Sequence, residues 1–304
     1  MNSSFHDQLV ATRDRKHSKN HPFFELWAQG KLSREQTAFY CTQHYHFVGE
    51  FLNWLAYQGS QIRERDVKNY LFENLGDEEN PDDRHLDMLK DYVAASGVNR
   101  DTVESSIVLA ATEGLQNWGW RMVYQRRWQA ALAGMFIGLE SQFLDICKKI
   151  VPALHKHYGF APHAREIRFF EEHIYADEVH GSKGFAIVEK YCNTPELQDL
   201  AIQMVEEATI RRWRYMNGIY WYALHGKQDD TPSLPDDPAA LRALLEKLVP
   251  RYLDAHTPTP RRELDRVGQQ VEQDLLRLLG VGEDGEGRLA GDTDEVQRLD
   301  RELR

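Results

Sequence analysis

His173, Asp177 and His180 form the pattern HxxxDxxH, in which two imidazoles and one carboxylate recur at helical spacing. Because a helix turns by about 100° per residue, these side chains fall within a sector of about 60° on one face. Two nitrogen ligands and one oxygen ligand on one stripe suit a single borderline metal centre. The alternative, which the motif alone leaves open, is a solvated polar stripe on an amphipathic helix.

Glu140 is a carboxylate in the middle of an apolar helix face. Its neighbours one turn away are Phe136, Ile137, Phe143 and Leu144. A buried carboxylate without a partner costs several kcal/mol or takes up a proton instead. Glu140 is therefore expected to have a cation, a hydrogen-bond network or a metal as its partner, and a buried Arg or Lys is the plain alternative.

A third candidate element is the acidic segment ENLGDEENPDDRH, which runs from Glu73 to His85. Glu78 and His85 are seven residues apart and would share a face of a continuous helix. Pro81 is expected to bend the chain between them and suits the first turn of a new helix. The segment could equally be a helix start whose acids favour the helix dipole.

Together, the three elements supply three carboxylates and three imidazoles. Six such ligands are what a dinuclear iron or manganese site in a helical bundle uses. The ExxH repeats of ferritin-like bundles are, however, missing from this sequence.

The elements that must position these residues have helical periodicity almost throughout, and convincing alternating strands are absent from the pattern. Ser33 and Gln36 form a capping-box signature at the start of one helix. We expect helices over 33–60, 64–76, from Pro81 onward, and over 101–112, 126–155, 163–180 and 194–224. The sequence predicts a compact all-α bundle.

Glycine and alanine mark two features of this bundle. The stretch 126–155 contains small residues that allow neighbouring helices to approach closely, namely Ala130, Ala131, Ala133, Gly134 and Gly138. Gly181 and Gly184 are expected to loosen the chain after the HxxxDxxH helix.

Aromatic residues and charge divide the chain into two parts. Of the 33 Phe, Tyr and Trp residues, 32 precede residue 229, and only Tyr252 follows it. Residues 229–304 contain 18 acids and 11 bases. We therefore predict a helical domain over 1–228, the linker-like segment QDDTPSLPDDP, and an acidic extension over 229–304. The extension could form short helices at 239–254 and 261–280 before a disordered tail.

The overall composition excludes several classes of protein. A net charge of −11 argues against a general binder of nucleic acid or anionic membranes. No window of eighteen apolar residues is present, and the N-terminus lacks the apolar core of a signal peptide. Three cysteines without a CxxC pair suit a reducing compartment. These features predict a soluble, cytoplasmic protein.

The motifs NLGDEENPDDRH, LESQ and HxxxDxxH, in this order, resemble the haem-oxygenase-like dinuclear iron oxidases and oxygenases. The wider superfamily includes thiaminase II and the pyrroloquinoline-quinone synthase C protein. The segment HPFFELWAQGKLSREQTAFY is also similar to the first helices of that superfamily. The resemblance covers roughly residues 5–225 and implies a haem-oxygenase-like helical bundle.

The resemblance implies a full set of metal ligands. By this resemblance, one metal is assigned the ligands Glu78, His85 and His173, and the other is assigned Asp177 and His180. Glu140 is available to bridge the two metals. Relatives often carry Gly where this chain has Pro81 and the acids after it. The resemblance therefore does not define the course of the backbone from Glu78 to His85. The six implied ligands, which are also the implied catalytic residues, are Glu78, His85, Glu140, His173, Asp177 and His180.

The chemistry that the resemblance implies is reductive activation of O2 at two Fe(II) ions, with an Fe/Mn pair equally compatible and an external reductant. Substrates of the family are small molecules such as amino acids, amines and fatty acids. The outcomes include N-oxygenation, desaturation and carbon–carbon cleavage. A homodimer is expected on the resemblance alone, with no nucleic-acid or membrane partner.

One branch of this family consumes its own Tyr and Lys side chains as substrate. The aligned positions here are Phe24 and Ile150, which have no comparable chemistry. We therefore expect this chain to act on a separate small molecule.

Two other functions remain as alternatives. Cys147, two turns from Glu140, could be the nucleophile of a thiaminase II-like hydrolase, although a lone cysteine on an apolar face is usually core filling. A non-enzymatic metal-binding or regulatory scaffold could use its acidic tail to recruit a basic partner.

Several further residues carry weaker signals. His44 and His46 are two residues apart and point about 200° away from each other, so they cannot share one metal. Tyr40 and His44 could line a cavity or belong to the core. Arg126 and Arg127 could hold a substrate carboxylate, but a solvated helix face explains them better.

Overall fold

Helices make up the architecture throughout the part of the chain that the structure describes, and no strand occurs there. This computed structural model describes residues 4–226, and within them the side chains of residues 175–181 are outside the description. The α-helices, with one π-helical segment (η3) and three short 3-10 turns (η1, η2, η4), are α1 (Phe5–Asp14), η1 (Ser18–Asn20), α2 (Pro22–Ala28), α3 (Arg34–Gln61), α4 (Arg65–Glu78), α5 (His85–Ala95), η2 (Arg100–Thr102), α6 (Ala110–Gln125), α7 (Trp128–Leu132), η3 (Ala133–Glu140), α8 (Ser141–Tyr158), η4 (Arg165–Ile167), α9 (Arg168–Tyr191) and α10 (Pro195–His225).

Local capping signals mark the ends of several of these helices. Ser33 accepts a hydrogen bond from the backbone N–H of Gln36, and the Gln36 side chain accepts one from Ser33 N–H. Thr194 caps α10, with Pro195 as its first residue. Gly159 ends α8 with a φ of 75°, a left-handed conformation that favours glycine. The all-α prediction is confirmed.

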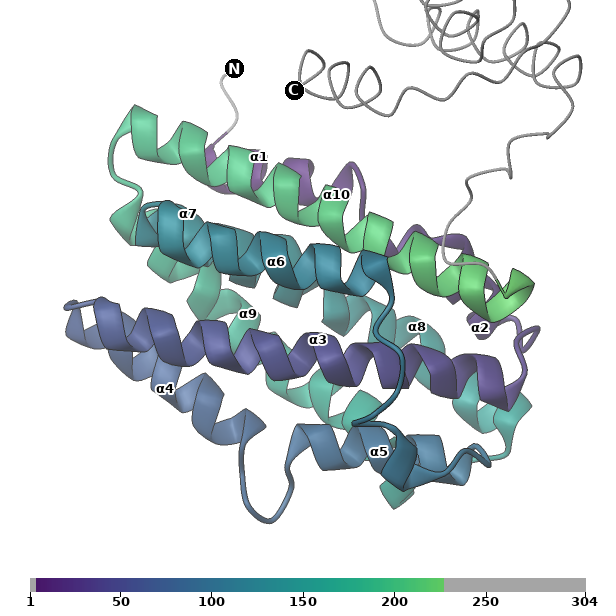
Figure 1. Cartoon of the computed structure of the whole chain (residues 1–304). Coiled ribbons are helices and arrows are strands. Elements are labelled where there is room, and N and C mark those ends of the chain that lie inside the picture. The colour runs from purple at the N-terminus through teal and green to yellow at the C-terminus, as the bar shows by residue number, and fades with distance from the viewer. Residues whose placement is uncertain (1–3, 227–304) are drawn as a thin grey trace, which may run out of the picture. The chain divides into compact units, whose positions relative to one another are not determined.

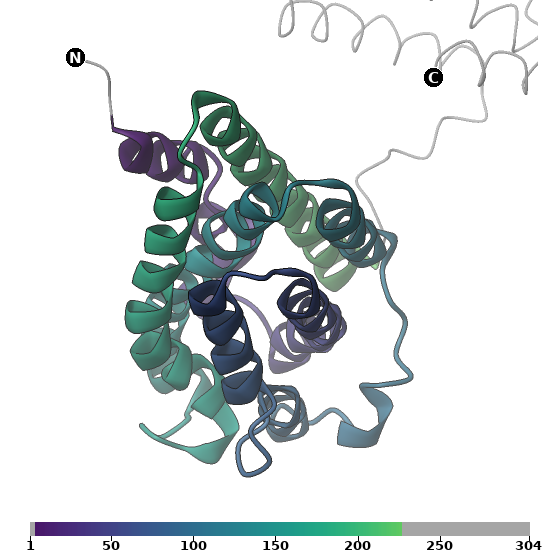
Figure 2. The ribbon, with the colours of Figure 1, turned by 90° about the vertical axis from the view of Figure 1, so that its left-hand side faces the viewer.

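The long helices pack side by side around one aromatic core. Helix α3 packs against α4, α5 and α6, and α10 packs against η3, α6 and α1, as Figure 1 shows. Figure 2 views the same helices along their axes, arranged around the interior that they share. The largest side chains fully buried there include Trp27, Trp54, Tyr40, Tyr92 and Tyr215.

The run α7–η3–α8 crosses the middle of the bundle as one helical stretch, with η3 as its π-helical part. A Cβ added to Gly138 would lie 2.3 Å from the Cβ of Ala208 on α10. One added to Gly134 would lie 2.6 Å from the Sδ of Met122 on α6. The prediction that small residues allow close approach is therefore confirmed.

The same run, Trp128–Tyr158, is the described helix that is long and apolar enough to cross a membrane. Inside this bundle, 78% of its most apolar window is buried. Its apolar surface is thus covered by neighbouring helices, as in the core helix of a globular domain.

The prediction of a helix over 101–112 is wrong. A short 3-10 turn at Arg100–Thr102 is followed by an irregular segment, and α6 begins only at Ala110. The Gln43 side chain explains the difference, because it donates to the carbonyl of Ile107 and accepts from the N–H of Leu109. These hydrogen bonds from α3 satisfy backbone groups that a helix would otherwise have used.

Two further boundaries differ from the prediction. Helix α5 begins at His85 and not at Pro81, because residues 80–84 form a turn in which Asn80 accepts from the backbone N–H of Asp82 and Asp83. Helix α9 begins at Arg168 and continues past Gly184 to Tyr191. A Cβ on Gly184 would lie 3.0 Å from the Cβ of Phe136, so this glycine serves close packing and does not end the helix.

The predicted boundary at residue 228 and the predicted helices at 239–254 and 261–280 lie outside the described residues. The acidic extension over 229–304 and its two helices stay predictions.

Candidate metal centre

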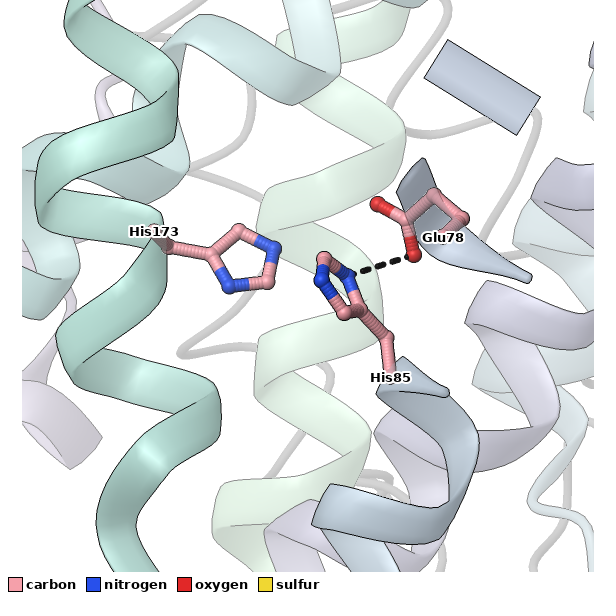
Figure 3. A group of neighbouring side chains, drawn as sticks. All are labelled: Glu78, His85 and His173. Carbon is pink, nitrogen blue, oxygen red and sulfur yellow. Dashed lines mark ion pairs between the residues drawn. The ribbon is translucent and has the colours of Figure 1, made fainter. Parts of the chain in front are cut away.

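Glu78, His85 and His173 meet at one place although they come from three helices, and we call them the donor cluster. Nδ1 of His85 lies 2.7 Å from Oε2 of Glu78. The rings of His85 and His173 have centroids 4.8 Å apart. One ligand atom from each residue lies within 4.8 Å of the others, and Figure 3 shows the three side chains pointing toward one another.

The turn between α4 and α5 brings Glu78 and His85 together. Glu78 is the last residue of α4 and His85 the first of α5, so the shared helix face considered above is not how they meet. Asp83 in this turn accepts from Nη2 of Arg168 at 2.7 Å, and Arg168 is the first residue of α9. This ion pair ties the turn to the helix that carries His173.

His173 is oriented by its own helix. Its Nδ1 lies 2.6 Å from the carbonyl oxygen of Phe169, which can only accept, so Nδ1–H donates. The lone pair of the neutral ring is then on Nε2. The rings of Phe143 and Phe169 contact the imidazole, with centroids 4.7 and 4.5 Å away. A backbone carbonyl that fixes the tautomer in this way is typical of a metal-ligating histidine.

A small cavity of about 30 Å³ lies between Glu78 and His173 of the donor cluster and Glu140. Glu140 is half-buried and ends η3, a π-helical turn of a kind that is frequent at functional sites. The lining residues from the described part of the chain are His44, Phe47, Val48, Phe51, Glu78, Leu139, Glu140, Phe143, Phe169, His173 and Arg212.

The structure therefore brings together four of the six predicted ligands. Asp177 and His180 lie further along α9 than His173, and their side chains are outside the described residues. The assignment of all six as metal ligands stays a prediction.

The donor set fits iron. Two imidazoles and one carboxylate are the combination found in non-haem Fe(II) sites that react with O2. Glu78 and His85 have side chains only 12% exposed, so a metal bound here would be largely shielded from bulk water.

His44, Phe143 and Arg212 form a second part of the cavity, which we call the arginine wall. Arg212 is 2% exposed, and its Nε and Nη2 have no hydrogen-bond partner among the described residues. Its guanidinium lies over the ring of Phe143, 5.8 Å from the centroid. Burial holds the pKa of His44 well below its usual value, and the positive charge of Arg212 lowers it further.

Sequence reasoning did not single out Arg212, although a signal was present. Its neighbours on the helix face include Ala208, Tyr215, Met216 and Ile219, so it stands on an apolar stripe as Glu140 does. The same argument applied to basic residues would have found it.

The weaker candidates separate clearly. His44 lines the cavity, whereas Nε2 of His46 lies 2.8 Å from Oγ of Ser106, outside the cavity's lining. Arg126 lies 3.8 Å from Glu207 in an ion pair.

Cys147 is fully buried and is not among the described residues that line the cavity. Phe24 and Ile150, at the two positions considered for a self-consumed Tyr and Lys, are also fully buried. These three side chains contribute to the core.

Comparison with known families gives a match over residues 38–213 to a family described as iron-containing redox enzymes. The chain is 27% identical over 228 residues to a 4-aminobenzoate synthase of Nitrosomonas europaea, covering 72% of this chain and 92% of that protein. It is 29% identical over 186 residues to a 4-aminobenzoate synthase of Chlamydia muridarum, covering 61% and 78%.

Solved structures show the same fold. A domain with a haem-oxygenase-like fold from Shewanella denitrificans aligns with a TM-score of 0.62 and 21% identity, covering 74% of this chain and 96% of that one. A TenA homologue from Pseudomonas syringae pv. tomato aligns with a TM-score of 0.63 and 16% identity, covering 71% and 93%. The haem-oxygenase-like fold expected from the sequence is thereby confirmed.

Proposed function

Because this chain belongs to the iron-containing redox enzyme family, we propose that this oxidoreductase is a non-haem dinuclear iron oxidase or oxygenase that uses O2 to oxidise a small molecule. The observation that carries the proposal is the donor cluster, two imidazoles and a carboxylate from three helices, beside a cavity that Glu140 also lines. The proposed ligands are Glu78, His85, Glu140, His173, Asp177 and His180.

Iron bound there would supply the electrons that reduce O2, with an external reductant restoring them. The protein's own residues would hold the metal and orient its ligand side chains. The Phe169 carbonyl keeps the Nε2 lone pair of His173 directed away from its helix backbone. Phe143 and Phe169 shield His173 from water, and a small cavity lies beside Glu140.

The similarity to 4-aminobenzoate synthases supports an amine or amino acid as the substrate, with oxidation at nitrogen. An Fe/Mn pair uses the same ligand types and is the alternative to two irons. We further propose that the enzyme is a cytoplasmic homodimer with no nucleic-acid or membrane partner.

Iron loading and O2 consumption test this function directly. Full-length protein incubated with Fe(II) without air should retain close to two irons per chain and should consume O2 when a reductant is added. Protein loaded with Zn(II) is the control, because it should bind metal and consume no O2. Iron loading without O2 consumption would contradict the proposal.

Two substitutions test the ligand assignment. Glu140→Gln and His173→Ala should each lower the bound iron below two per chain while the helical circular-dichroism signal persists. His157→Ala, at an exposed histidine of α8, is the matched control and should keep the full metal content. Full iron in either ligand variant would show that the assignment is wrong.

A further inference from the structure

We propose that Arg212 binds the carboxylate of the substrate, so that this enzyme acts on a small organic acid. The proposal rests on the proposed function only for the oxidation itself, since anchoring a carboxylate requires no iron. The structural observation is Arg212 itself, a residue of the cavity lining that is 2% exposed and whose guanidinium has two buried nitrogens without a hydrogen-bond partner among the described residues.

An unsatisfied buried charge is costly to the fold. More than nine-tenths of buried polar groups in proteins have a partner, and a buried cation without one loses its hydration with no compensation. Arg212 keeps its charge under all ordinary conditions, because a guanidinium is not deprotonated in proteins. A ligand that supplies the missing acceptors would offset this cost.

The two nitrogens without partners define the shape of that ligand. Nε and Nη2 lie on the same edge of the guanidinium, and their N–H bonds run parallel. This edge matches the two oxygens of a carboxylate in a bidentate pair. The Phe143 ring beneath the guanidinium, 5.8 Å away, further restrains the orientation of that edge.

The cavity's own acids do not fill this role. Neither Glu78 nor Glu140 forms a hydrogen bond with Nε or Nη2 of Arg212. Glu78 is engaged with His85, and both acids belong to the proposed ligand set. Among the described residues no acid fills this role, and the proposed acceptor for Arg212 is therefore a bound ligand.

A carboxylate on Arg212 would place the rest of a small molecule near the donor cluster. Phe143 contacts both Arg212 and His173, with the imidazole centroid 4.7 Å from the phenyl centroid. The other cavity walls are largely aromatic, with Phe47, Phe51 and Phe169 among them. Because the cavity holds little more than water, a flat aromatic acid would have to displace some of these side chains as it binds, and they would then contact its apolar body.

Binding of benzoate and of its neutral counterpart benzamide tests the proposal. Affinities for full-length protein, metal-free and loaded with Zn(II), are measured by ligand-observed NMR or calorimetry. Benzoate should bind at least about tenfold more tightly than benzamide, since a charged bidentate pair contributes that much or more. Arg212→Met should lose this preference and leave benzamide binding within about twofold of the wild type.

Two further variants keep the test decisive. Arg214→Met is the matched control, because Arg214 lies on the same helix but is exposed, and it should bind both probes as the wild type does. Arg212→Lys keeps the charge without the parallel N–H pair, so its benzoate affinity should be intermediate. If Arg212→Met does not fold, the Arg212→Lys variant alone tests the proposal.

Several outcomes would overturn the proposal. These are no millimolar benzoate binding by the wild type, no preference over benzamide, or equal losses for both probes in the Arg212 variants. The last result would mean that Arg212 only supports the fold. Because the binding measurements need no iron, a failure of O2 consumption would refute the proposed function and leave this inference standing.

Discussion

The donor cluster and the arginine wall are both charged parts of one cavity, but they are built in opposite ways. Glu78 and His85 lie at helix ends around a turn, and Oε2 of Glu78 is 2.7 Å from Nδ1 of His85. Arg212 lies in the middle of α10, and two of its donors have no partner within the described chain. The donor cluster can change its internal contacts when a metal binds, whereas the arginine wall, on the proposal above, gains its missing partners only from a ligand.

His85→Ala should separate the two regions most strongly. Removing one imidazole should weaken iron binding more than the roughly 10- to 100-fold caused by losing an outer-shell partner, and should leave benzoate binding unchanged. Metal titration and the benzoate assay, run on the same samples, measure both. Parallel losses in the two assays would show that the two regions are not separable.

Acid should weaken the anchoring of the helix that carries Arg212, through His21. Nδ1 of His21 accepts from the N–H of Phe23, and Nε2 lies 3.0 Å from Oδ1 of Asn217 on α10, so the ring is neutral. Burial lowers its pKa to about 4. Above pH 6.5 neither the folded nor the unfolded state is protonated. As the pH falls from about 6.5 to 4, only the unfolded chain takes up the proton, and the free energy of unfolding falls by about 3 kcal/mol.

His21→Asn tests this assignment, because asparagine can cap α2 without titrating. Urea unfolding between pH 7 and pH 4 should show that the free energy of unfolding falls less steeply with pH in the variant than in the wild type. The difference in slope should correspond to about one proton fewer taken up on unfolding. Equal slopes for the two proteins would show that His21 does not carry the effect.

Gly138→Ala should disturb the contact between η3, which carries Glu140, and α10. The new Cβ would lie 2.3 Å from the Cβ of Ala208, so backbone must shift, at a cost of about 2 kcal/mol in unfolding free energy. Gly114→Ala on α6 is the control. Nothing lies within 4 Å of its added Cβ, and the substitution should stabilise by up to about 1 kcal/mol. Equal effects at both positions would contradict the close packing.

Arg212→Met should change stability less than Gly138→Ala does, and it should stabilise the protein where Gly138→Ala destabilises it. Replacing a buried charge that lacks partners with an apolar side chain should raise the free energy of unfolding by about 1 kcal/mol in ligand-free protein. Chemical denaturation without added carboxylate measures it. A clear loss of stability would indicate that the protein itself uses the charge.

Part of the site could be predicted from the sequence because its signals are local. Glu140 stands out through its apolar neighbours within one helix turn, and the spacing of the HxxxDxxH residues follows from helical geometry. The meeting of Glu78 and His85 could not be predicted in this form. It depends on the turn at Pro81 and on an ion pair between Asp83 and Arg168, which are 85 residues apart in sequence.

The sequence by itself determined where several helices begin and end and which residue types could bind a metal. Capping hydrogen bonds and helical periodicity join residues within a turn or two, so neighbouring letters encode them. The tertiary structure decided what distant segments do to one another. Gln43 prevents the helix expected at 101–112, and Gly184 packs against Phe136 within α9. The partners of Arg212 depend on every segment around it, and no local pattern encodes them.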